Sequence, residues 1–104
     1  MAHYCVTFRI AEKPAAGLSA AERRQRLIDN VYTKGGGFWD EPTSFIFAES
    51  ALDTYQFGGK AVEGLSRRDD LVLIFDPEDM SACYFGPIED EAVLLSFLPG
   101  AKKL

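Results

Sequence analysis

The stretch that decides the fold is LVLIFDPEDMSACYF, residues 71–85. Leu71–Phe75 is apolar at every position, which predicts a β-strand that is buried on both faces. Asp76–Asp79 combines a proline with acidic residues, a composition typical of a turn. The short apolar run Ser81–Phe85 predicts a second strand after that turn. We therefore expect a hairpin here, and its first strand needs cover on both faces.

Strands and helices alternate in the sequence before this hairpin. Tyr4–Ile10 alternates with period two, which predicts a strand with one face under the helices and a second face of mixed character. The other predicted elements are a helix at Leu18–Lys34, a short extended segment at Phe38–Trp39, a strand at Thr43–Ala48 and a helix at Ala51–Leu65. This order gives two β-α-β halves, the pattern of a ferredoxin-like β-α-β-β-α-β sandwich. The expected fold class is therefore α+β, ferredoxin-like, with an extra C-terminal strand and a short helix.

Capping residues mark the starts of the two longer helices. Ser19 and Glu22 form an S-x-x-E capping box at the start of the first helix. Ser50 is the expected N-cap of the second helix. Gly58 and Gly59 fall inside that helix, so we expect either very close packing at these positions or an interrupted helix.

Glycine and proline mark the helix ends. Gly35–Gly37 follow a helix and precede a strand, the reverse of the order in a phosphate-binding loop, so we interpret them as a helix stop. Gly35 suits the left-handed position after the helix. Ile88–Leu98 predicts a short last helix with Asp90 as its N-cap, ended by Pro99.

Length and composition predict a single domain over residues 1–104. The net charge of -5 does not favour a nucleic acid partner, because phosphate binding needs a basic surface. Cys5 and Cys83 lie in apolar runs without C-x-x-C spacing, so we expect two buried free thiols, with a disulfide as the alternative. No apolar run approaches the ~20 residues of a membrane span. With no basic and apolar leader at the N-terminus, we expect a cytoplasmic protein without a membrane partner.

The apolar strand also bears on assembly. In a four-stranded ferredoxin-like sheet Leu71–Phe75 lies at an edge, where a fully apolar strand is prone to aggregate. Either the Ser81–Phe85 strand or a second subunit can cover it. Together with the mixed second face of Tyr4–Ile10, this predicts a homodimer packed through the open face of the sheet. Arg9 is then partly buried, and it needs either an acid of the second subunit or an anionic ligand as its partner.

A few other residues are candidates for ligand binding. Trp39 and Tyr55 are expected near a small-molecule pocket, and Asp40 is a third candidate beside them. Asp40 and Glu41 are adjacent carboxylates, which can hold a divalent cation. Consecutive side chains of an extended segment point to opposite faces, so we interpret this pair as part of a turn and predict no metal site.

The remaining charged residues are expected on the surface. Arg23, Arg24 and Arg26 form the one basic cluster, and we interpret it as an exposed, charged helix face. Phosphate binding by this cluster is the alternative. Asp69 and Asp70 predict a solvated turn, and His3 predicts a solvated side chain near the terminus. We therefore predict no catalytic residues and no cofactor.

Four segments carry a family resemblance: the strand Tyr4–Ile10, the arginine-bearing helix Ala20–Tyr32, WDEPTSFIFAES at 39–50 and DDLVLIF at 69–75. Across them the chain resembles the CRISPR-associated small ferredoxin-like nuclease family and its virulence-associated endoribonuclease relatives. The resemblance implies a homodimer with one ferredoxin-like sheet per subunit. It also implies that active members hold a metal with an aspartate near the end of the first strand. This chain has Arg9 in the matching stretch, and a cation repels a metal ion.

The expected function is therefore a non-catalytic binding or interaction module on a nuclease-like scaffold. One alternative is a metal-dependent ribonuclease that uses acids from elsewhere, such as Asp40, Glu41 or Asp70. A second alternative is a small-molecule enzyme or binder of the dimeric α+β-barrel type, with its pocket near Trp39 and Tyr55.

Overall fold

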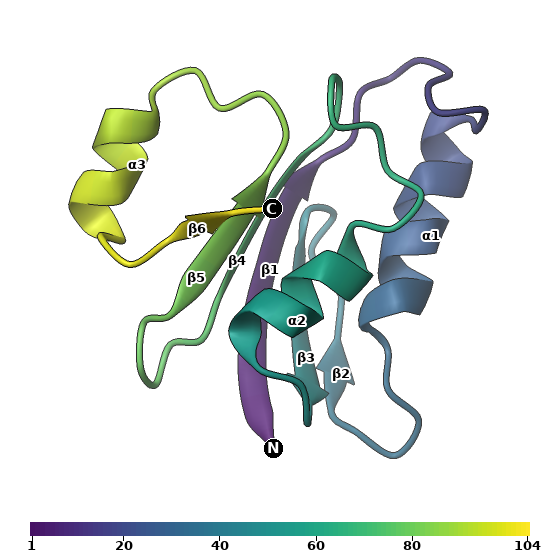
Figure 1. Ribbon diagram of the computed structural model, residues 1–104. Helices are drawn as coiled ribbons and strands as arrows, with labels where there is room; N and C mark the ends of the chain where they lie inside the picture. Colours follow the sequence, from purple (N-terminus) through teal and green to yellow (C-terminus); the bar gives the residue numbers. More distant parts are fainter.

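The computed structural model describes residues 1–104 as a six-stranded sheet with three helices (Figure 1). The strands are β1 (Ala2–Arg9), β2 (Phe38–Trp39), β3 (Phe45–Ser50), β4 (Leu71–Phe75), β5 (Ala82–Phe85) and β6 (Lys102–Lys103). The helices are α1 (Ala20–Val31), α2 (Thr54–Ala61) and α3 (Glu91–Phe97). The α+β sandwich with an extra strand and a short helix near the C-terminus is confirmed.

The strand order is β2-β3-β1-β4-β5-β6, with β1 antiparallel to both of its neighbours. α1 joins β1 to β2 across β3, and α2 joins β3 to β4 across β1. This arrangement is consistent with a split β-α-β topology. β5 pairs with β4, so the hairpin strand covers the edge of β4 within one subunit. The sequence did not predict β6, whose two lysines run parallel to β5.

The core lies between the sheet and the two longer helices. Tyr4, Val6 and Phe8 of β1 point into it, as the period-two pattern predicts. The Tyr4 ring stacks on Phe57 of α2 with ring centroids 4.3 Å apart. Its hydroxyl donates a 2.6 Å hydrogen bond to the carbonyl oxygen of Leu52, so the buried phenol keeps a polar partner.

The helix starts were predicted in part. The Ser19–Glu22 capping box is present at the start of α1. The prediction of Ser50 as the N-cap of α2 is wrong, because Ser50 is the last residue of β3. Asp53 caps α2 instead, in a reciprocal capping box with Gln56. In both helices the N-cap side chain accepts a hydrogen bond from the backbone N–H three residues later. Aspartate serves as this acceptor as well as serine does.

Both longer helices are shorter than predicted. α1 ends at Val31, where Tyr32 already has an extended backbone, so Gly35 is not the residue after a C-cap. Gly35 adopts a φ of 83° in the turn closed by the Gly36 N–H and the Thr33 carbonyl. This turn, and not the helix end, is what requires the glycine.

Arg23 and Asp70 are a buried ion pair, which corrects the prediction that both lie on the surface. Both side chains are fully buried, and Arg23 Nε donates to Asp70 Oδ2 at 2.8 Å. The guanidinium also donates to three carbonyls of the loop before α1, those of Ala11, Lys13 and Leu18, at 2.9 Å each. The pair therefore joins α1, this loop and the start of β4, and every buried side-chain polar atom has a partner.

Candidate functional site

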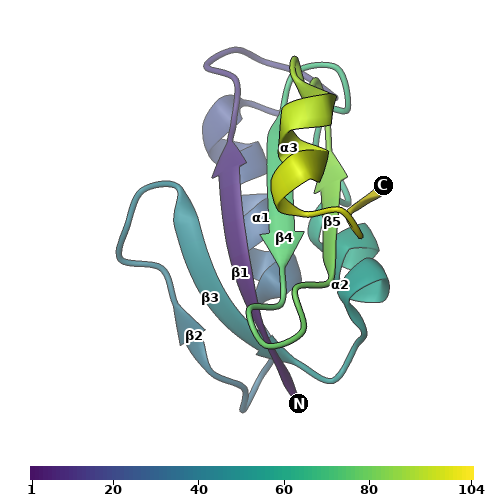
Figure 2. The same cartoon turned by 90° about the vertical axis from the view of Figure 1, so that its left-hand side faces the viewer.

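The second face of the sheet is only partly covered. α1 and α2 pack on the first face, whereas α3 lies over β4 and β5 on the other side (Figure 2). β1, β3 and β2 have no helix on that side. Because side chains alternate along a strand, the residues opposite the core are His3, Cys5, Thr7, Arg9, Trp39, Phe45, Phe47 and Glu49. We call these eight residues the open face.

An aromatic cluster lies on β2 and β3 of the open face. Trp39 and Phe47 are cross-strand neighbours, with ring centroids 5.8 Å apart. Phe45 meets Phe47 edge to face at 4.8 Å. Trp39 remains 41% exposed and Phe47 remains 45% exposed. Neighbouring exposed aromatic side chains on a sheet are typical of a binding surface.

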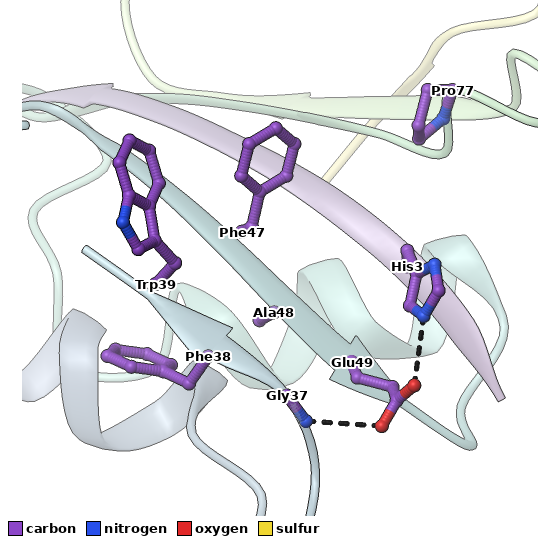
Figure 3. Close-up of a pocket in the computed structure, with 8 residues that line it drawn as sticks. All are labelled: His3, Gly37, Phe38, Trp39, Phe47, Ala48, Glu49 and Pro77. Atoms are coloured by element: carbon purple, nitrogen blue, oxygen red, sulfur yellow. Dashed lines mark hydrogen bonds and ion pairs between the residues drawn. The ribbon is translucent and has the colours of Figure 1, made fainter. Parts of the chain in front are cut away.

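A cavity of about 400 Å³ lies beside this cluster (Figure 3). Trp39 and Phe47 form one wall, and Pro77 lies across from them at the β4–β5 turn. At the end of the cavity, Glu49 accepts a hydrogen bond from the Gly37 N–H at 3.1 Å and lies 2.9 Å from His3 Nε2. These contacts, the Gly37 bond first, hold the pKa of Glu49 below its usual value.

The structure separates the predicted ligand-binding residues. Trp39 lines the cavity just described, but Tyr55 lies on α2 and lines a different cavity with Asp53 and Lys102. The expectation of one pocket near both Trp39 and Tyr55 is therefore wrong. Arg9 is exposed at the other end of β1 from His3.

The acids considered for a metal-dependent ribonuclease do not gather into a ligand set. Asp70 is held by Arg23 in the interior, and Glu41 accepts a 2.8 Å hydrogen bond from Trp39 Nε1. No group of three or more histidine, cysteine, aspartate or glutamate side chains lies close enough to hold a metal ion.

Sequence reasoning missed two features of the surface. His3 and Glu49 pair because they are opposite each other in the β1–β3 register, and residues 46 positions apart show no local signal of this. A third cleft brings Arg9 together with Arg24, Thr43 and Ser44. Its residues come from β1, from α1 and from the loop before β3, so only the folded chain shows it.

No family model matches the chain, and neither a curated protein nor a solved structure matches it. The resemblance to the CRISPR-associated nucleases stays a prediction. None of the helices has the length and apolar character that crossing a membrane requires.

Proposed function

We propose that this protein is a non-catalytic interaction module that works as a homodimer through its open face. The observation that carries the proposal is the exposed aromatic cluster on an uncovered sheet face. Trp39 and Phe47 lie side by side on that surface, and both are more than 40% exposed in a single subunit. Burying such rings between two subunits removes apolar area from water, at about 25 cal/mol per Å².

Charge supports a second copy of the chain as the occupant. The whole chain carries a net charge of -5, so most of its surfaces repel one another in a dimer. The centre of the open face carries no charged side chain: Arg9 is at one end, and the anion Glu49 at the other end is paired with His3. Two copies therefore bring aromatic rings together without opposing like charges at the centre.

The part of the open face next to β4 also supports an interface. Cys5 is opposite Phe47 on one side and Phe75 on the other. Leu73 and Phe75 of β4 are half-buried next to it, so the apolar surface continues beyond β1 toward α3. A continuous apolar surface with a charged margin is the usual anatomy of a protein interface.

The test is sedimentation equilibrium of the native chain and of Phe47→Glu. We expect a concentration-dependent dimer in the native protein and a monomer in the variant, because each subunit of a variant dimer buries an unpaired carboxylate. Tyr55→Glu is the matched control, since Tyr55 is an equally exposed aromatic on the helix side of the molecule. A native protein that stays monomeric, or a Tyr55 variant as disrupted as the Phe47 variant, contradicts the proposal.

The cavity beside Trp39 supports a second candidate function, a binder of small molecules. About 400 Å³ lies within the range of small-ligand sites, and its walls include the aromatic rings of Phe38, Trp39 and Phe47, with the His3–Glu49 pair at the end. Quenching of Trp39 fluorescence by a panel of aromatic metabolites tests this candidate. Saturable quenching that Phe47→Ala abolishes would favour the binder, whereas a flat response across the panel would leave the dimer as the better explanation.

A further inference from the structure

A third cleft, the one that contains Arg9 and Arg24, lies where β1 ends, away from the His3–Glu49 pair. Its volume is about 420 Å³, and β1, α1 and the loop before β3 contribute its walls. Its charged side chains are those of Arg9, Arg24 and Glu12. None of the three belongs to an ion pair, although the chain forms ion pairs elsewhere.

The Arg24 guanidinium makes two contacts within the chain. Its Nη2 donates to the carbonyl oxygen of Thr43 at 3.1 Å, and its guanidinium lies over the Phe8 ring, 5.9 Å from the centroid. These two contacts restrict the group and leave its other N–H donors without a protein acceptor. A restricted guanidinium loses little further freedom when it binds an anion.

Three more donors border the same cleft. Arg9 is exposed there, one residue after Phe8. Thr43 and Ser44 contribute hydroxyl groups that make no hydrogen bond within the chain. Guanidinium forks and hydroxyls match the oxygens of a phosphate group, and two cations balance its double negative charge.

We propose that this cleft binds the phosphate group of a phosphate monoester, a small organic molecule with one terminal phosphate. The cleft is larger than a phosphate ion needs, and the apolar side chains of Phe8 and Ile10 line it beside the arginines. Phe8 is buried in the core beneath Arg24, so the organic part of the ligand packs on the half-buried Ile10 side chain while Arg9 and Arg24 hold the phosphate. This inference does not require the homodimer: every group it uses belongs to one subunit, and Arg9 lies at the end of the open face, away from the aromatic cluster.

Glu12 makes the proposal sharply testable. It is the single acid of the cleft, and its carboxylate repels a phosphate dianion. Removing that charge at Glu12→Gln therefore tightens binding, whereas removing a cation at Arg9→Gln or Arg24→Gln weakens it. If the Glu12 variant binds more tightly and the two arginine variants bind more weakly, the phosphate binds at this cleft. Net charge acting over the whole surface would not depend on where each residue lies.

The experiment is a titration with phenyl phosphate, followed by amide chemical shifts of the ¹⁵N-labelled protein. We expect saturable shifts confined to the amides around Ile10, Thr43 and Ser44. Arg9→Gln and Arg24→Gln should each weaken binding about tenfold, the effect of losing one charge-assisted contact. Glu12→Gln should strengthen it a few-fold. Lys60→Gln and Glu63→Gln are the matched charge controls on an exposed part of α2 and the residues after it, and both should bind as the native chain does.

Three results would overturn the proposal. The first is a set of shifts spread over the surface without saturation. The second is an equal loss of affinity in Lys60→Gln and Arg9→Gln, or an equal rise in Glu12→Gln and Glu63→Gln. The third is a short RNA that binds through Arg9 while phenyl phosphate does not, because the ligand would then be a polymer backbone. If Arg24→Gln fails to fold, the Arg9 and Glu12 variants decide the outcome.

Discussion

At the scale of single residues, Arg23 and Asp70 depend on each other in the interior. Arg23→Met removes the cation and leaves a fully buried carboxylate without its charge partner. We expect a loss of about 3–5 kcal/mol in the free energy of unfolding, the usual cost of breaking a buried ion pair on one side. Urea unfolding measures it.

Arg24→Met is the control for this prediction, since Arg24 is the next residue on the same helix and makes no ion pair. It should cost less than about 1 kcal/mol. The double variant Arg23→Met with Asp70→Asn should be more stable than Arg23→Met alone, because no buried charge remains. A double variant that is less stable by the full sum of the two single losses would show that the two residues act independently.

Burial also controls the chemistry of Cys83. It raises the pKa of this thiol from 9.0 to about 12. Above pH 9.0 the unfolded chain releases the proton and the folded chain keeps it, so stability is complete at lower pH and falls as the pH rises toward 12. We expect this group to lower the free energy of unfolding by up to about 1.4 kcal/mol per pH unit in that window.

Urea unfolding at about pH 8 and about pH 10 measures this loss. Cys83→Ala should lose less stability between the two pH values than the native chain does. The pKa of Cys5 is also raised, chiefly by burial, so part of the loss should persist in the variant. Equal losses in the two proteins would mean that the thiol of Cys83 does not couple ionisation to folding.

At the scale of elements, α2 shows why its two neighbouring glycines differ. A Cβ on Gly58 would come within 2.3 Å of Cys83 Sγ, whereas a Cβ on Gly59 would meet nothing within 4 Å. Gly58→Ala should therefore cost about 1–3 kcal/mol through overpacking. Gly59→Ala should stabilise the protein by about 0.5–1 kcal/mol through helix propensity. Thermal unfolding compares the two.

The double variant Gly58→Ala with Cys83→Ala tests the cause, because it removes the sulfur that the new methyl group meets. It should recover part of the stability that Gly58→Ala loses. Equal stability of the two single glycine variants would refute the close packing of α2 on β5.

Local pattern predicted the elements well, and long-range packing decided what it missed. Strand alternation in residues 4–10 and the Ser19–Glu22 capping box depend on neighbours in sequence, so the sequence predicted both. Asp70 looked like a turn residue because its partner Arg23 is 47 positions away, on another element. The lysines of β6 have no strand signal, and only pairing with β5 makes them a strand.

At the scale of the whole molecule, the candidate site was predictable only in outline. The mixture of apolar and polar side chains on the second face of β1 predicted that this face packs against a second subunit. Trp39 and Phe47 come together through the β2–β3 register, and the Arg9–Arg24 cleft forms across three elements. A sequence pattern shows which face of a strand a residue lies on, but not what lies beside it.

The open face also predicts how the single tryptophan reports assembly. Trp39 is 41% exposed in one subunit, so the proposed dimer moves its ring out of water. We expect its emission to shift to shorter wavelength as the concentration rises through the dissociation constant, in step with the dimer fraction from sedimentation. Phe47→Glu should keep the longer wavelength at every concentration, and Tyr55→Glu should follow the native curve. A dimer that forms without any change in Trp39 emission contradicts an interface through the aromatic cluster, because such an interface covers the Trp39 ring.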